Sequence, residues 1–91
     1  MHVDIELYGV ARQRAGTSHI QVPASGESLT LAQIITRLAE SYPGLARECF
    51  PDGNLARDYA VCVNGERFVR AADTLIRAGE SILIMSADAG G

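Results

Sequence analysis

The chain has 91 residues, of which 47% are hydrophobic and 21% charged, and its formal net charge is −3. This composition is typical of one globular domain whose core forms without metal or disulfide bonds. The acidic balance argues against nucleic-acid binding, and the absence of lysine from the sequence excludes a P-loop lysine that would grip a nucleotide phosphate.

Two strands are predicted at the start of the chain. Residues 3–8 (VDIELY) alternate between apolar and polar side chains, which is the period of a half-buried strand. The alternation returns at 19–23 (HIQVP), where Pro23 ends the strand because proline cannot continue a ladder. We predict a loop over residues 9–18 between them, so the pair should form an antiparallel hairpin. Its core face comprises Val3, Ile5, Leu7, Ile20 and Val22.

One main helix follows the hairpin. After a turn at 23–28, apolar residues adopt helical spacing over residues 30–42, and Thr30 with Gln33 fits a capping box at the start. A short helical turn is predicted at 45–50. The buried stripe of the main helix comprises Leu31, Ile34, Ile35, Leu38 and Tyr42.

The C-terminal half is predicted to form strands. Asn64-Gly65 lies between two β-type runs, and both residues accept the positive φ of a type I′ turn, so residues 59–69 should form a hairpin. Residues 71–81 are predicted as a loop. The run ILIMS at 82–86 is apolar on both faces, which is typical of a central strand. We expect it to lie beside the first strand, with the intervening chain as the crossover.

Together these elements define the fold class as α+β. One long helix must bury its apolar face, and a single sheet is the available partner. We predict a mixed sheet of about five strands packed on one main helix. All of it should form one domain over residues 1–91, with a flexible C-terminal tail at 86–91.

The sequence also predicts where the protein resides. No apolar run approaches the roughly 20 residues of a membrane-spanning helix, and the N-terminal MHVDIELYGV lacks the pattern of a signal peptide. We therefore expect a cytoplasmic protein that contacts no membrane. In that compartment Cys49 and Cys62 should be free thiols.

The interior shows no catalytic or metal-binding pattern. His2 and His19 fall in predicted strands without further ligands at metal-binding spacing, so we expect no metal and no bound cofactor. Two histidines and scattered serines give little support to a nucleophile–base pair, and no lysine is present to form a Schiff base. Any chemistry should therefore lie outside the core.

The chain ends with SADAGG, directly after the last predicted strand. Because glycine lacks a Cβ, Gly90 and Gly91 can enter a narrow channel in another protein. The α-carboxylate of Gly91 is a group that ATP can activate as an acyl-adenylate. The alternative is that the two glycines do nothing, since chain termini tolerate glycine.

With this tail and element order, the sequence resembles the ubiquitin-like β-grasp sulfur carriers of the MoaD/ThiS type, which include the small subunit of molybdopterin synthase. The matching segments are VDIELYGVARQRAGT, LTLAQIITRLAESYPGL, VCVNGERF and IRAGESILIMSADAGG, nearly the whole chain. The resemblance implies a sulfur-carrying cosubstrate, or the small subunit of a synthase, rather than a stand-alone enzyme. Gly91 would carry the acyl-adenylate and then the thiocarboxylate. Gly90 would let the tail enter the narrow active site of a partner.

The same resemblance implies the partners. An E1-like adenylyltransferase would use ATP to activate the terminal carboxylate, a sulfurtransferase would supply sulfur, and the large subunit of an acceptor synthase would receive it. Met85-Ser86-Ala87 stands where a Phe-Pro-Pro-like stretch is common, so the pathway stays open. Molybdopterin synthesis is the first expectation, with thiamine, cysteine, another thiolated metabolite or a tRNA base as alternatives. A ubiquitin-like modifier conjugated through Gly91, or a β-grasp interaction domain with an inert tail, would share the fold.

Strand parity predicts a binding surface near the root of the tail. If the core face of the first strand packs on the helix, Tyr8 faces away from it, and Cys62 faces away by the same parity. The last strand can present either of its two faces, Leu83 with Met85 or Ile82 with Ile84. We predict an exposed apolar patch that binds partners together with the tail. The patch comprises Tyr8, Cys62 and Met85, and the partner-binding residues of the tail are Ala87, Asp88 and Ala89.

Overall fold

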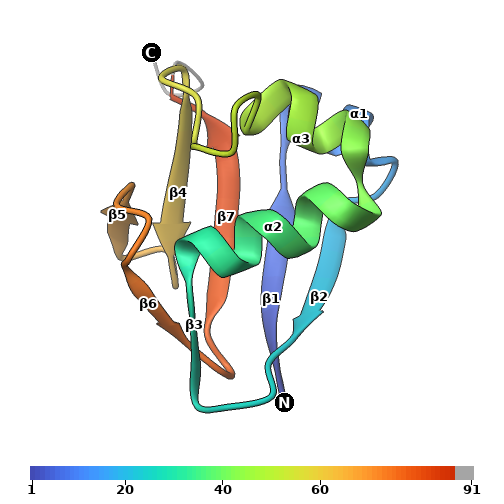
Figure 1. The fold of residues 1–91 in the computed structure, drawn as a ribbon. Coiled ribbons are helices and arrows are strands. Elements are labelled where there is room, and N and C mark those ends of the chain that lie inside the picture. The colour runs from blue at the N-terminus through green and yellow to red at the C-terminus, as the bar shows by residue number, and fades with distance from the viewer. Residues whose placement is uncertain (88–91) are drawn as a thin grey trace.

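The structure is a computed structural model that describes residues 1–87. Figure 1 shows a sheet with one helix lying across one of its faces and two shorter helices at one end. In chain order the elements are β1 (His2–Leu7), α1 (Gly9–Ala15), β2 (His19–Pro23), β3 (Ser28–Thr30), α2 (Leu31–Ser41), α3 (Pro43–Cys49), β4 (Tyr59–Val63), β5 (Arg67–Val69), β6 (Leu75–Arg77) and β7 (Ser81–Ser86). None of the helices in the described part of the chain is long and apolar enough to cross a membrane.

The main sheet is mixed, with the strand order β2-β1-β7-β4-β5. β1 and β7 run parallel, which pairs Ile5 with Ile82 and Leu7 with Ile84, and the other neighbouring strands are antiparallel. The last strand therefore lies at the centre of the sheet beside the first, as its two apolar faces predict. The predicted α+β fold, with five strands packed on one main helix, is confirmed.

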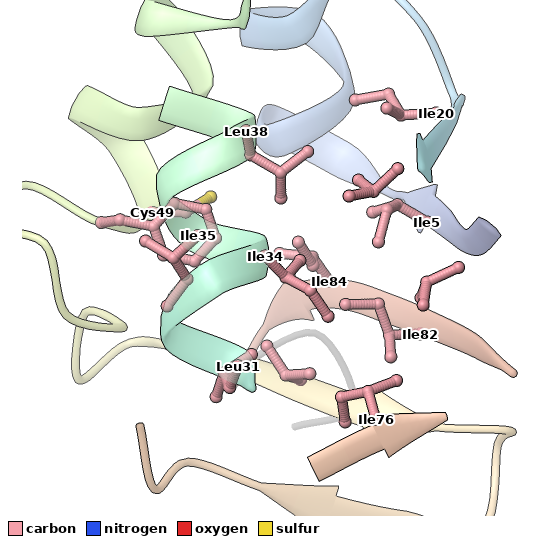
Figure 2. Close-up of a cluster of buried hydrophobic side chains, with 14 of the residues drawn as sticks. Ile5, Ile20, Leu31, Ile34, Ile35, Leu38, Cys49, Ile76, Ile82 and Ile84 are labelled. Carbon is pink, nitrogen blue, oxygen red and sulfur yellow. The ribbon is translucent and has the colours of Figure 1, made fainter. Parts of the chain in front are cut away.

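Helix α2 forms where the sequence predicts it and covers one face of the sheet (Figure 1). Its capping box is complete: Thr30 Oγ1 accepts the N–H of Gln33 at 3.1 Å, and Gln33 Oε1 accepts the N–H of Thr30 at 2.8 Å. Figure 2 shows Ile34 and Leu38 of α2 directed at the sheet residues beneath, such as Ile82. Among the described residues, the buried set contains no charged or polar side chain, so hydrophobic burial drives this packing.

The hairpin predicted from Asn64-Gly65 is present between β4 and β5. These two residues have φ values of 55° and 70°, the left-handed conformation that a type I′ turn requires. The carbonyl of Val63 accepts the N–H of Glu66 at 2.9 Å. The strand register pairs Val63 with Arg67, so the loop contains three residues.

Two short helices lie at one end of the sheet, and the sequence predicted only part of one of them. The loop predicted at 9–18 is wrong, because this segment forms α1. Tyr8 makes no side-chain cap bond at its start, so the usual signal for a helix is missing; Gly16, at φ 79°, closes its end. The helical turn predicted at 45–50 is α3, which begins earlier, at Pro43, because the fixed φ of proline suits a first helical position.

A second, two-stranded sheet was not predicted. Its strands β3 and β6 pair antiparallel. β3 runs from Ser28, the last residue of the predicted turn, to Thr30, the predicted start of the helix, and β6 lies within the segment predicted as a loop at 71–81. Each strand has three residues and buries one of them, Leu29 in β3 and Ile76 in β6. Strands this short do not display a period that sequence analysis can detect.

Candidate functional site

Strand β7 ends on the side of the sheet where α1 and α3 also lie (Figure 1). Ser86 belongs to β7, and the N–H of Ala87 donates to the carbonyl oxygen of Asp58 at 2.8 Å, which extends the β4–β7 ladder by one residue. The segment predicted as tail, 86–91, thus begins inside the sheet. Four predicted site residues lie outside the described part of the chain: Asp88, Ala89, Gly90 and Gly91.

A hollow of about 260 Å³ lies beside this root. Its walls come from the start of α1, the end of α3, the segment before β4 and the end of β7. The structure brings together here two residues that strand parity places near the root, Tyr8 and Met85. The lining residues are Tyr8, Gly9, Val10, Glu48, Asp58, Tyr59, Met85 and Ser86.

Glu48 connects three of the elements around the hollow. The hydroxyl of Tyr59 in β4 donates to Oε2 of Glu48 in α3 at 2.7 Å. Burial and then this hydrogen bond raise the pKa of Tyr59, so the phenol stays protonated and remains a donor. The other oxygen of Glu48 lies 3.6 Å from Nε of Arg14 in α1. These contacts fix the wall of the hollow on the side of the helices.

Neither cysteine presents an exposed thiol near the root. Both are free. Cys49 is fully buried, and burial followed by the charge of Glu48 raises the pKa of its thiol to about 12, so it is protonated at neutral pH. Cys62 is 5% exposed. The expectation that Cys62 forms part of an exposed patch is therefore wrong, although its parity was right.

Tyr8 stands where β1 ends and α1 begins, and it is 45% exposed. Its hydroxyl donates to Oε2 of Glu6 at 2.8 Å, and this hydrogen bond, followed by the charge of Glu6, raises the pKa of the phenol. Tyr8 therefore presents a ring with a protonated hydroxyl to solvent, a combination that is common at protein interfaces.

The face of the sheet opposite α2 carries a row of apolar side chains. Ile82 and Ile84 are fully buried on the side of α2, which decides that Leu83 and Met85 face the other way. The strand register places Ala60 opposite Met85, Cys62 opposite Leu83 and Phe68 opposite Cys62. Tyr8 follows β1 and donates its hydroxyl to Glu6, the β1 neighbour of Leu83. We define the open-face patch as Tyr8, Ala60, Phe68, Leu83 and Met85.

Sequence analysis missed two members of this patch, the small Ala60 and the large Phe68. Phe68 is 69% exposed and lies opposite Cys62 in the β4–β5 ladder. The turn signal pointed to the other face: a two-residue loop at Asn64-Gly65 would pair Phe68 with Val61 and direct it toward α2, whereas the observed three-residue loop pairs it with Cys62 on the open face. In the sheet, Cys62 lies between the larger side chains of Phe68 and Leu83, which explains its low exposure.

The described residues contain no group of three or more His, Cys, Asp or Glu side chains that could hold a metal ion. The two histidines do come together across β1 and β2, but around a carboxylate: Nε2 of His2 and Nε2 of His19 each lie 3.5 Å from Oδ1 of Asp4. Nε2 of Gln21 donates to the same oxygen at 3.3 Å. This arrangement is a polar cluster on the surface of the sheet.

The model of the ThiS family matches residues 5–91 of the chain. Among solved structures, SAMP1 from Haloferax volcanii has a TM-score of 0.82 at 24% identity, covering 100% of both chains. The BexX/CysO complex of Amycolatopsis orientalis has a TM-score of 0.73 at 25% identity, covering 98% of this chain and 99% of that one. CysO of Mycobacterium tuberculosis has a TM-score of 0.72 at 27% identity, covering 93% and 98%. No curated protein matches the chain.

The sheet order, the helix across one face and the central last strand define a ubiquitin-like β-grasp protein. Within that class, the chain belongs to the ThiS family. Its relatives are MoaD/ThiS-like sulfur carriers and ubiquitin-like modifiers, so the resemblance drawn from the sequence is confirmed.

Proposed function

We propose that the chain is a sulfur carrier whose working group is the α-carboxylate of Gly91. The observation that supports this most directly is the course of β7. This central strand is paired on both sides and leads to Ala87, whose N–H is still bonded to the sheet. Four residues separate this anchored point from the carboxylate. Membership of the ThiS family supports the same role.

In the proposed reaction, an E1-like adenylyltransferase joins the carboxylate of Gly91 to the α-phosphate of ATP and releases pyrophosphate. A persulfide on a sulfurtransferase then attacks the acyl carbon and expels AMP, which gives an acyl disulfide. A second thiol attacks the donor's sulfur in this disulfide, so the donor leaves as a disulfide with that thiol and the chain keeps a C-terminal thiocarboxylate. Gly90 permits close approach because it has no Cβ. The carrier binds no cofactor in this scheme, and ATP is bound by the activating partner.

The open-face patch and the hollow are the proposed docking surface for these partners. Exposed apolar area that includes an aromatic ring and a methionine is typical of interfaces. Met85 is suited to partners of different shape because its side chain is unbranched and adaptable. Ala87 would meet the partner at the fixed root of the tail, Asp88 and Ala89 would pass along the partner's channel, and Cys62 contributes little surface. For the acceptor we propose the large subunit of molybdopterin synthase.

Intact-mass spectrometry tests the carrier role. The purified chain, incubated with the E1-like enzyme of the same organism, ATP and a sulfur donor, should gain the mass of one oxygen-to-sulfur replacement, and should not gain it without ATP. The thiocarboxylated product is then offered to candidate acceptor enzymes. Sulfur transfer to an enzyme of another pathway, and not to molybdopterin synthase, would show that the proposed acceptor is wrong. A wild-type chain that keeps its mass beside an active enzyme pair would refute the carrier role.

Gly90→Val is the matched variant for this assay. The branched side chain should block entry of the tail and abolish the mass gain. The unfolding temperature should stay at the wild-type value, because terminal residues contribute little to stability. Loss of the mass gain together with a lower unfolding temperature would show that the substitution acts on the fold and not on access.

A second candidate is a ubiquitin-like modifier that is conjugated through Gly91. It is favoured by the similarity to small archaeal modifier protein 1 from Methanosarcina acetivorans, which has 25% identity over 99% of this chain. After activation in a cell extract, a modifier should give a ladder of heavier conjugates, whereas a carrier should give the thiocarboxylate. Because the protein has no lysine, such a ladder cannot contain copies of it that are joined to one another through lysine. A β-grasp domain with an inert tail would give neither product.

A further inference from the structure

Arg70, the residue directly after β5, reaches back to the segment that leads into β4. Its Nη1 donates to the carbonyl oxygen of Tyr59 at 2.6 Å, and its Nη2 donates to the carbonyl oxygens of Ala56 at 2.8 Å and Leu55 at 3.3 Å. Three neutral acceptors from one segment therefore converge on one guanidinium. Of the carboxylates that the structure describes, none forms an ion pair with Arg70, so charge pairing does not explain where it lies.

The segment that Arg70 holds, residues 55–59, is also the anchor of the tail. Asp58 lies between Ala56 and Tyr59, both of which are fixed by the guanidinium. The carbonyl oxygen of Asp58 accepts the N–H of Ala87 at 2.8 Å. Movement of this segment would therefore move the point from which the chain continues toward its C-terminus.

We propose that Arg70 is a positioning residue for the C-terminal tail: it fixes segment 55–59 so that the Asp58 carbonyl holds Ala87 at a set point beside the open-face patch. This inference rests on the proposed carrier function. The four residues after Ala87 span at most about 14 Å, which limits where the carboxylate can meet a partner docked on the patch. Since reaction requires a narrow geometry, a loose anchor lowers the rate in the bound complex.

Arginine suits this role better than other basic residues. Its planar fork has donors in fixed directions and can serve several carbonyls at once, whereas a lysine ammonium is a compact charge on a flexible stem. The rest of the segment has independent supports: the N–H of Ala56 donates to the carbonyl of Cys49 at 2.8 Å, and the hydroxyl of Tyr59 donates to Glu48. Loss of the guanidinium should therefore loosen the anchor without unfolding the domain.

The variants to compare are Arg70→Ala, Arg70→Lys and, as the matched control, Arg37→Ala. Arg37 lies on α2, and its Nη1 also donates to a backbone carbonyl, that of Pro23 at 2.9 Å. The control thus removes the same kind of bond from a different part of the fold. Amide hydrogen exchange by NMR provides the first readout. Exchange at Ala87 should accelerate by about tenfold in Arg70→Ala and stay at the wild-type rate in Arg37→Ala, with the amides of β1 and β7 unchanged in both.

Adenylation kinetics provide the second readout. With the E1-like enzyme, ATP–pyrophosphate exchange is measured against carrier concentration. Arg70→Ala should lower kcat by about tenfold while the KM for the carrier stays near the wild-type value, because the docking patch is intact. Arg70→Lys should recover part of the lost rate. Arg37→Ala should behave as wild type in both parameters.

The two readouts separate the failure of this inference from failure of the proposed function. If the wild-type chain is not adenylated, the carrier role fails and amide exchange alone decides whether Arg70 anchors Ala87. If the wild-type chain is adenylated and Arg70→Ala matches Arg37→Ala in both assays, the positioning role is refuted. Faster exchange throughout the sheet of Arg70→Ala would show a general stabilising role and would also overturn the inference.

Discussion

Replacing Gly44 with alanine should force α1 and α3 apart. Gly44 is the second residue of α3, and a Cβ built on it lies 2.9 Å from the backbone carbonyl oxygen of Arg14 in α1. A Cβ does not approach another atom this closely, and a backbone oxygen cannot swing aside as the end of a long side chain can. Its φ does not lie in the positive range, so alanine can adopt the local conformation. The cost is therefore steric.

The size of the effect follows from two opposing terms. Overpacking of a close contact typically costs about 1–3 kcal/mol. Alanine has a higher helix propensity than glycine, which returns up to about 1 kcal/mol. The net loss of unfolding free energy for Gly44→Ala can then lie between about 0 and 3 kcal/mol, and its central value is about 1–2 kcal/mol. For a domain of this length, that lowers the unfolding temperature by roughly 4–16 °C.

Thermal unfolding followed by circular dichroism measures this loss, with Gly26→Ala as the control. An added Cβ at Gly26 has no atom within 4 Å, and its φ is also outside the positive range. The control should be neutral or stabilising by up to about 1 kcal/mol, because alanine reduces the entropy of the unfolded chain. If Gly44→Ala unfolds at or above the temperature of Gly26→Ala, the close packing of α1 on α3 is wrong.

Three further predictions concern the core, the buried thiol and the patch. Leu38→Ala should lower the unfolding free energy by about 2–5 kcal/mol through a cavity under α2, and a loss below 1 kcal/mol in urea titration would argue against this packing. Because burial raises the pKa of Cys49 from 9.0 to about 12, its contribution to stability is fully present below pH 9 and is lost as the pH rises toward 12. Over that range the wild type should lose up to about 1.4 kcal/mol per pH unit more than Cys49→Ala, and equal slopes would contradict the shift. Phe68→Ala should weaken binding to the E1-like partner by about tenfold in calorimetry, whereas Leu75→Ala, 59% exposed on β6, should not; equal affinities would remove Phe68 from the interface.

Much of the fold was predictable because its signals are local. The period-two strands, the capping box at Thr30 and the Asn64-Gly65 turn each depend on residues close in sequence. Helix α1 was missed because its start lacks a cap and its stability comes from α3, far along the chain. The second sheet was missed for the same reason, because Leu29 and Ile76 are brought together only by the tertiary fold.

The sequence predicts which face of the sheet the candidate site residues lie on, but not how exposed each side chain is. Alternation placed Tyr8 and Cys62 on the correct side of the sheet, since direction is set by the strand itself. It left the face of Met85 open, because the last strand is apolar on both faces, and the burial of Ile82 and Ile84 decides it. Exposure depends on the neighbours across the ladder, and these bury Cys62 while Phe68 stays exposed. The contacts of Arg70 could not be predicted at all, because its acceptors are backbone carbonyls, which every residue has.

The position of β7 suits a protein that must hand its C-terminus to several partners. An edge strand has one neighbour, so force or binding at its end can peel it from the sheet at the cost of one ladder. β7 is paired with β1 on one side and β4 on the other, and its Ile82 and Ile84 are fully buried under α2. At the end of the strand, Met85 and Ser86 pair with β4 alone, whereas opening β7 from Ile84 inward requires both ladders and the core contacts to break together, which approaches the free energy of global unfolding. A partner can consequently use its binding energy to orient the tail, because the root stays fixed while the tail is drawn into the partner's channel.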